Sequence, residues 1–317
     1  MIKILFAGSP EAAKHTLEIL EKAQSLYDFS IAGVLSNPPS AKGRHKELIP
    51  TPAAAFAQEK AIPVFTPEHL DGAARDAISP LGADLLVSFA YGHIFGPKFL
   101  ALFPMGGINL HPSLLPKYRG CTPVPAAILN RDSKTAVTVQ TLSLKMDEGD
   151  ILAQTVVELK GKETSESLLN YSAEEGARLI CEIIKKCGEA GSLPQGTPQS
   201  GEPSYTGIIT KEDGRINWKD AAVAIEAKIR AYYPEPGCWC LENGSPLRIL
   251  EAELFTDIKY EDAAAGSVLE FSRQYGILIK TGAGILAVKK LQRQGKNAMD
   301  YKSFMNGARN FIGTMLE

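Results

Sequence analysis

The chain has 317 residues, more than one ordinary domain needs, so we expect two domains. Hydrophobic residues make up 44% and charged residues 22%, a balance that excludes a disordered or collagen-like protein. With 34 Lys and Arg against 36 Asp and Glu, the net charge of -2 excludes a protein that coats nucleic acid through overall positive charge, although a local basic patch stays open.

No stretch of the sequence has the pattern of a signal peptide or of a membrane span. The apolar run within Met1–Gly8 is too short for a signal-peptide core, and no later stretch approaches the roughly 20 apolar residues of a membrane span. We therefore expect a cytoplasmic protein without membrane contact. The five cysteines form no C-x-x-C pair and have no His cluster beside them, which favours free thiols over disulfides or a zinc site.

The N-terminal part alternates between apolar strands and helices. An apolar run from Ile2 to Phe6 ends at a turn, after which Ala13, Leu17 and Leu20 recur at helical spacing. Further buried-strand runs follow, with helices between several of them: residues 31–35, 62–65, 84–89 and 107–110. This order predicts a Rossmann-like α/β domain whose parallel sheet is covered on both faces.

The second part of the chain has a different pattern. Alternating residues after Thr135 suggest a longer strand through Leu144, and residues 168–187 have a helical apolar face, so we end a catalytic domain (1–188) there. Residues 189–204 are rich in Gly, Pro, Ser and Gln and are predicted to be a linker. Short strands are expected at residues 238–241, 247–255, 266–271, 276–280 and 285–291. Five such strands predict an OB-type β-barrel in a C-terminal domain (205–317).

The first strand, turn and helix do not carry a dinucleotide-binding fingerprint. Gly8 is a single glycine where that fingerprint needs three, so nicotinamide binding is disfavoured. The P-loop signature is absent as well.

The densest run of chemically useful residues is Asn109–Gly120. Strand alternation puts Asn109 and His111 on one face, at the carboxyl end of a strand, where open α/β sheets bind ligands. An amide and an imidazole there can stabilise a developing oxyanion while the imidazole handles a proton. A turn-capping Asn and a structural His are the alternative. The acidic loop at residues 143–150 favours the catalytic interpretation because it could place a carboxylate beside His111 and orient the ring.

His111–Gly120, with Asn109 before it and Asp147 after it, resembles the signature of the 10-formyltetrahydrofolate-dependent formyltransferases. The resemblance implies that Asn109 and His111 polarise the formyl group and its tetrahedral intermediate, and that Asp147 supports proton transfer. It also implies folate contacts from two segments, formed by Ser113, Leu114, Leu115 and Pro116 and by Phe89, Tyr91 and Gly92.

Within this family the chain is most similar to the two-domain members that act on initiator methionyl-tRNA. Ala41–Pro52 resembles the basic insertion with which they enter the acceptor end of the tRNA, and Arg44 stands at the position of its key arginine. A solvated basic loop is the alternative for this segment. Residues 215–218, 229–234 and 295–299 are similar to the second domain of these members. The predicted tRNA-binding residues are Lys42, Arg44, Lys46, Lys211, Lys289, Lys290, Arg293 and Lys296.

The resemblance therefore implies transfer of a formyl group from 10-formyltetrahydrofolate to the α-amino group of methionine on initiator tRNA, by a monomer that needs no metal. A formyltransferase for an amino-sugar nucleotide is the alternative, since it shares the three catalytic residues and can share a small second domain. A noncatalytic RNA-binding protein of the same fold is disfavoured because Asn109, His111 and Asp147 are all present.

Overall fold

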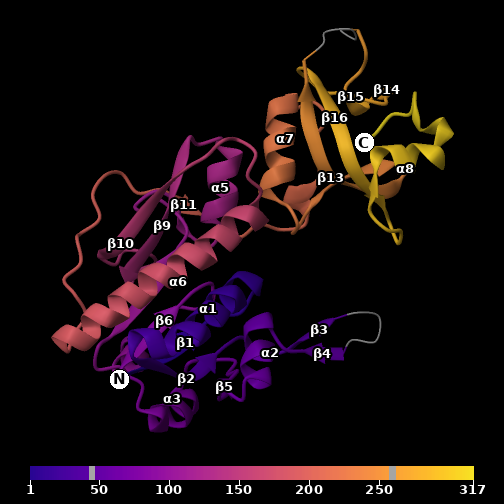
Figure 1. Cartoon of the computed structure of the whole chain (residues 1–317). Coiled ribbons are helices and arrows are strands. Elements are labelled where there is room, and N and C mark those ends of the chain that lie inside the picture. Colours follow the sequence, from indigo (N-terminus) through magenta and orange to yellow (C-terminus); the bar gives the residue numbers. More distant parts are fainter. Residues whose placement is uncertain (43–46, 257–261) are drawn as a thin grey trace. The chain divides into compact units, whose positions relative to one another are not determined.

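The structure, a computed structural model, describes residues 1–42, 47–256 and 262–317. They form two compact units (Figure 1). The first contains residues 1–123, 134–158 and 168–207, and the second contains residues 124–133, 159–167 and 208–317. Residues 189–204, for which a linker is predicted, are packed as part of the first unit. Within the described ranges, no helix is long and apolar enough to cross a membrane.

A seven-stranded sheet in the order β10-β9-β7-β6-β1-β2-β5 forms the centre of the first unit. Its strands are β1 (Ile2–Ala7), β2 (Phe29–Leu35), β5 (Val64–Phe65), β6 (Leu85–Ser88), β7 (Gly107–His111), β9 (Lys134–Thr141) and β10 (Ile151–Glu158). The first five run parallel, as predicted, whereas β9 and β10 are antiparallel additions at one edge. After β1 the chain forms β2 on one side of β1, and later forms β6 on the other side. Open α/β sheets bind ligands at the point where the strand order reverses in this way.

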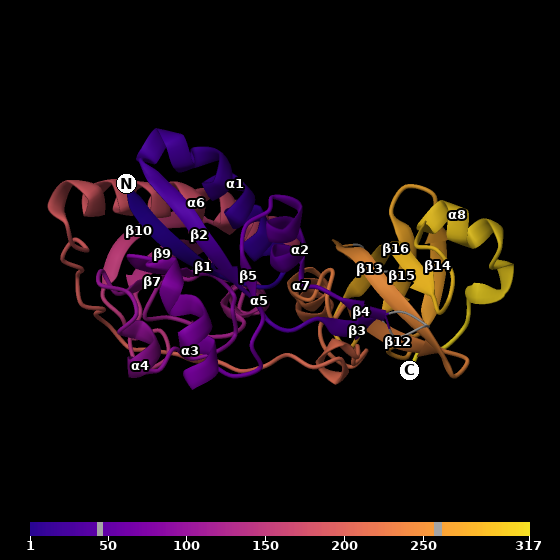
Figure 2. The same ribbon diagram turned by 90° about the horizontal axis from the view of Figure 1, so that it is seen from below.

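Two apolar cores cover the two faces of this sheet. Alternate residues of β1 enter different cores: Ile4 packs in the core that includes α1 (Glu11–Tyr27) and α6 (Ser165–Ala190). Leu5 packs in the core that includes α3 (Gly72–Ile78) and α4 (Pro97–Leu100). Figure 2 shows these two helix pairs on opposite sides of the sheet. The expected coverage of both faces is confirmed. The remaining helices of the first part of the chain are α2 (Pro52–Glu59) and α5 (Pro123–Leu129).

The helix α6 packs against β7, the strand that carries Asn109 and His111. Gly176 of this helix lies against Leu110 of β7, and a Cβ at that position would overlap the Leu110 side chain. The helix therefore packs closely on the Leu110 side chain, between Asn109 and His111 in the strand. The predicted strand through Leu144 is shorter than expected, because β9 ends at Thr141 and Leu144 is an exposed loop residue.

The second unit contains an antiparallel sheet in the order β12-β13-β16-β15-β14, with β17 paired to β16. The strands are β12 (Cys238–Glu242), β13 (Ser245–Phe255), β14 (Val268–Ser272), β15 (Gly276–Lys280), β16 (Ile285–Arg293) and β17 (Met299–Asp300). All five predicted strands are present. The helices α7 (Ala222–Ala231) and α8 (Tyr301–Asn306) accompany them, and most of α5 also belongs to this unit. The structure establishes an antiparallel β domain, and the OB-type barrel stays a prediction.

Candidate active site

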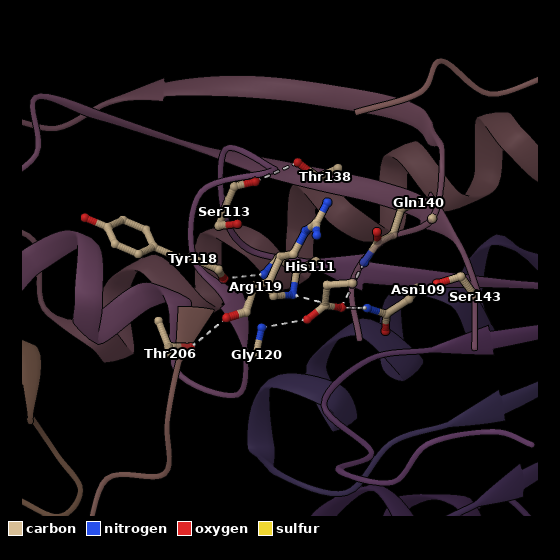
Figure 3. A network of polar contacts seen from close by, with 12 residues as sticks. Asn109, His111, Ser113, Tyr118, Arg119, Gly120, Thr138, Gln140, Ser143 and Thr206 are labelled. Atoms are coloured by element: carbon tan, nitrogen blue, oxygen red, sulfur yellow. Dashed lines mark hydrogen bonds and ion pairs between the residues drawn. The ribbon is translucent and has the colours of Figure 1, made fainter. Parts of the chain in front are cut away.

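Polar side chains converge at the carboxyl ends of β6 and β7. In the sheet, Asn109 is in register with Ser88 of β6 on one side and with Gln140 of β9 on the other. His111 follows two residues later at the end of β7, and Figure 3 shows its ring and the Asn109 amide directed into the same cluster. The strand alternation predicted this shared face.

The loop between β9 and β10 brings Asp147 into contact with both residues. Its Oδ1 lies 3.4 Å from Asn109 Nδ2 and 3.6 Å from His111 Nδ1. The same oxygen accepts a hydrogen bond from Gln140 Nε2 at 2.9 Å, and Oδ2 accepts one from the backbone N–H of Gly120 at 2.8 Å. The structure thus brings the three predicted catalytic residues together.

The orientation of the His111 ring follows from its hydrogen bonds. Nε2 lies 2.9 Å from the carbonyl oxygen of Tyr118 (Figure 3), and because a carbonyl oxygen can only accept, Nε2 carries the proton and donates it. Nδ1 is then the nitrogen that faces Asp147. The ring is almost fully buried, so this hydrogen bond replaces contact with water.

Several side chains of the cluster were not predicted from the sequence. Gln140 is buried on β9, where it is the one amide side chain in a strand otherwise rich in Thr and Val, and a buried amide needs a polar partner. Arg119, at the start of β8 (Arg119–Gly120), is bonded to Glu148 and to Gln199. Gln199 lies in the segment predicted to be a linker, where nothing in the sequence distinguishes it from its neighbours.

Comparison with known proteins places the chain in a family. Residues 2–184 match the family model described as Formyl transferase, and residues 208–309 match the one described as Formyl transferase, C-terminal domain. The chain belongs to the formyltransferase family. The predicted family resemblance is thereby confirmed.

Similar formyltransferases extend over nearly the whole chain. The chain is 42% identical to a methionyl-tRNA formyltransferase of Treponema denticola, over 98% of each chain. It is 40% identical to that of Treponema pallidum over 97% of each chain, and 37% identical to that of Borrelia duttonii over 98% of this chain and 99% of the other.

Solved structures share the fold at lower sequence identity. HypX from Aquifex aeolicus in complex with tetrahydrofolic acid superposes with a TM-score of 0.67 at 16% identity, over 98% of this chain and 48% of that one. A sugar 3N-formyl transferase, WlaRD, gives a TM-score of 0.61 at 21% identity, over 94% of this chain and 99% of that one. Methionyl-tRNA formyltransferase from Clostridium thermocellum gives 0.59 at 14% identity, over 80% and 94% of the two chains. These likenesses establish the fold alone.

The two predicted folate segments of this formyltransferase begin at neighbouring strand ends. Phe89 follows β6 and packs in the core, and Tyr91 stacks on Phe95 with ring centroids 5.4 Å apart. Burial raises the pKa of Tyr91 to about 12. Gly92 is exposed, with a φ of 86° that favours glycine.

The other segment, after β7, has its own internal bonds. Ser113 Oγ donates to the Lys117 carbonyl at 2.6 Å, and the Ser113 carbonyl accepts from Thr138 at 2.7 Å. Leu115 is buried, and Leu114 and Pro116 are half-buried. These bonds shape the loop that the formyltransferase would present to folate, and the contacts themselves stay predictions.

The eight predicted tRNA-binding residues differ in their surroundings. Arg44 and Lys46 lie outside the described residues. Lys42 ends β3 (Ser40–Lys42), which pairs antiparallel with β4 (Glu47–Ile49). Lys211, Lys290 and Lys296 are exposed.

Two of the predicted bases already have acidic partners. Lys289 Nζ lies 2.9 Å from Glu253. Arg293 donates two hydrogen bonds to the Glu242 carboxylate, at 2.7 and 2.6 Å, and this contact raises the pKa of Arg293. The basic surface of the second unit is therefore more neutralised than the sequence suggested. Among the residues that the structure describes, no group of three His, Cys, Asp or Glu side chains is placed to hold a metal ion.

Proposed function

We propose that this formyltransferase transfers the formyl group of 10-formyltetrahydrofolate to the α-amino group of methionine on initiator methionyl-tRNA. The product is N-formylmethionyl-tRNA for translation initiation. The cluster of Asn109, His111 and Asp147 supports the reaction. The observation that carries the choice of substrate is the end-to-end similarity to methionyl-tRNA formyltransferases, up to 42% identity over 98% of both chains.

The side chains have distinct tasks in this reaction. As the amine attacks the formyl carbon, the formyl oxygen gains negative charge. The Asn109 amide directs one proton at Asp147 and keeps its second proton for that oxygen. His111 keeps its Nε2 proton on the Tyr118 carbonyl, so Nδ1 is the nitrogen available for proton transfer beside Asp147. The proton leaves the amine and reaches N10 of the folate as the bond between N10 and the formyl carbon breaks.

The proposal assigns a separate task to each part of the chain. Residues 1–188 would carry catalysis, residues 189–204 would link the domains, and residues 205–317 would form an OB-type barrel that binds tRNA. The hydrogen bonds of the C-terminal residues support a closed sheet, because Glu317 bonds to Leu241 of β12 and Thr314 bonds to Val268 of β14. The protein would act as a monomer in the cytoplasm.

Two reactions distinguish the proposed substrate from an amino-sugar nucleotide. The purified protein is incubated with 10-formyltetrahydrofolate and either initiator methionyl-tRNA or a dTDP-linked amino sugar, and the formylated product is measured. We expect formyl-methionine on the tRNA and no formylated sugar. Formylation of the sugar nucleotide alone would show that the proposed substrate is wrong.

The ion pairs of the second unit predict which bases bind phosphate. Lys290→Ala should weaken tRNA binding and lower the slope of log K against log salt by about one counterion or less, because each phosphate contact releases condensed cations. Arg293→Ala should change this slope less, since Glu242 already neutralises the guanidinium. The measurement is the affinity for initiator tRNA across a KCl series. Equal slope changes in both variants would mean that Arg293 exchanges Glu242 for a phosphate.

A further inference from the structure

Gln199 connects the predicted linker to the loop that carries Asp147. Its Nε2 lies 2.8 Å from the Asp147 carbonyl oxygen and 2.8 Å from the Gly149 carbonyl oxygen. The same nitrogen lies 3.1 Å from Gln140 Oε1. Gln140 in turn donates to the Asp147 carboxylate. One amide group thus contacts both the backbone of the catalytic loop and the side chain that supports its carboxylate.

Only one orientation of the Gln199 amide satisfies these neighbours. Its Oε1 accepts two hydrogen bonds from Arg119, from Nη2 at 2.8 Å and from Nε at 3.2 Å. A flipped amide would direct its NH₂ at the guanidinium and its oxygen at two carbonyls, so every contact would be repulsive. Arg119 therefore fixes which end of Gln199 faces the loop.

The side chain and the backbone of Arg119 are both fixed by other contacts. It is buried, and its Nη1 donates to Glu148 at 3.0 Å and to the Tyr205 hydroxyl at 2.9 Å. Its backbone belongs to β8, which pairs in parallel with β11 (Tyr205–Thr206). The guanidinium is thus a rigid support for Gln199.

The catalytic loop needs such support because its backbone is strained. Asp147 has a φ of 53°, in the left-handed region, which is unfavourable for a residue with a side chain and persists only where surrounding contacts enforce it. Two residues later, a Cβ at Gly149 would overlap the Thr141 carbonyl oxygen, so the loop closes tightly at its base. The Gln199 amide bonds to the carbonyls of these two residues.

We propose that Gln199 is a positioning residue, which holds the left-handed backbone of Asp147 so that its carboxylate stays against Asn109 and His111. The inference rests on the proposed function for its kinetic consequence. The geometry of the loop, by contrast, can be measured without any substrate. Since the Gly120 N–H donates to Asp147 Oδ2, hydrogen exchange at Gly120 reports whether the carboxylate is in place.

Two substitutions distinguish the two contacts of the Gln199 side chain, one with the loop of Asp147 and one with Arg119. Gln199→Glu keeps an acceptor for Arg119 but points a carboxylate oxygen at the two carbonyls. Gln199→Met removes both contacts at similar size. We expect both variants to lower kcat roughly 10–100-fold, since a catalytic group displaced by about 1 Å can cost that much, with KM for either substrate changed less than about threefold. Gly120 should exchange faster in both.

Gln195 provides a matched control, because it is an exposed glutamine in the same segment. Gln195→Glu and Gln195→Met should keep the wild-type kcat and the wild-type exchange at Gly120. Thermal unfolding checks that each variant is folded. Should Gln199→Met not fold, Gln199→Glu, which keeps the Arg119 contact, decides alone.

The outcomes distinguish the two proposals. If wild-type protein does not formylate methionyl-tRNA, the proposed function is wrong, and exchange at Gly120 still decides the role of Gln199. A Gln199→Glu variant with wild-type exchange at Gly120 would overturn the positioning role, as would one with wild-type kcat.

Discussion

Replacing His111 by Ala, or Asp147 by Asn, is expected to lower the rate of formyl transfer by about 10²–10⁴-fold, the usual cost of losing general acid–base help. In Asp147→Asn the new NH₂ group must replace one of two oxygens that accept N–H groups, from Gln140 and from Gly120. The variant therefore loses both the charge and a hydrogen bond. The measurement is single-turnover formylation of initiator methionyl-tRNA at saturating folate.

The binding of tRNA should stay close to that of the wild type in both variants, because the proposed mechanism places these side chains at the reacting group rather than at the polyanion. His69→Ala is a suitable control, since this histidine is exposed. Near-normal turnover in either active-site variant would contradict the mechanism.

Asn109→Ala is expected to reduce kcat by about 10²–10³-fold, since a single oxyanion donor contributes roughly 2.7–4 kcal/mol to transition-state stabilisation. The loss should appear in kcat because the formyl oxygen carries full negative charge only after the amine has attacked. Affinity for the folate co-substrate should change little. Measuring kcat and the folate Kd in the same preparation separates these effects.

Asn130→Ala serves as the matched control, since Asn130 is exposed and its amide bonds to the backbone of its own helix. A variant of Asn109 that loses folate affinity but keeps kcat would show that this amide binds substrate and does not stabilise the oxyanion.

Local periodicity accounts for much of what could be predicted of the fold. Continuous apolar runs predicted the parallel strands, because a strand covered on both faces needs apolar side chains on both. The same reasoning missed β10, whose positions are all half-buried or exposed and whose apolar residues are interrupted by Gln154 and Thr155, so no continuous apolar run marks it. The antiparallel direction of β9 also had no local signal, since direction depends on how the chain returns to the sheet.

For the site, the sequence determined which side chains share a strand face. Asn109 and His111 lie together because alternate residues of a strand point the same way, a rule that needs no tertiary information. The family signature added Asp147, and comparison with relatives along the full chain supports the substrate. The ion pair between Arg293 and Glu242 could not be foreseen, because the two residues meet only when β12 and β16 are in place.

The sequence by itself therefore determined the α/β class, the strands of the second unit and the shared strand face of Asn109 and His111, all of which depend on local pattern, whereas Asp147 came from the family signature. The tertiary structure decided how Asp147 comes to lie beside His111 and which contacts fix the conformation of its loop. His111 lies at a strand end and Asp147 in a strained loop, and Gln199, from a distant segment, donates a hydrogen bond to the backbone of that loop. Contacts between residues so far apart along the chain depend on how the loops close, and hydrophobic periodicity carries no information about loop closure.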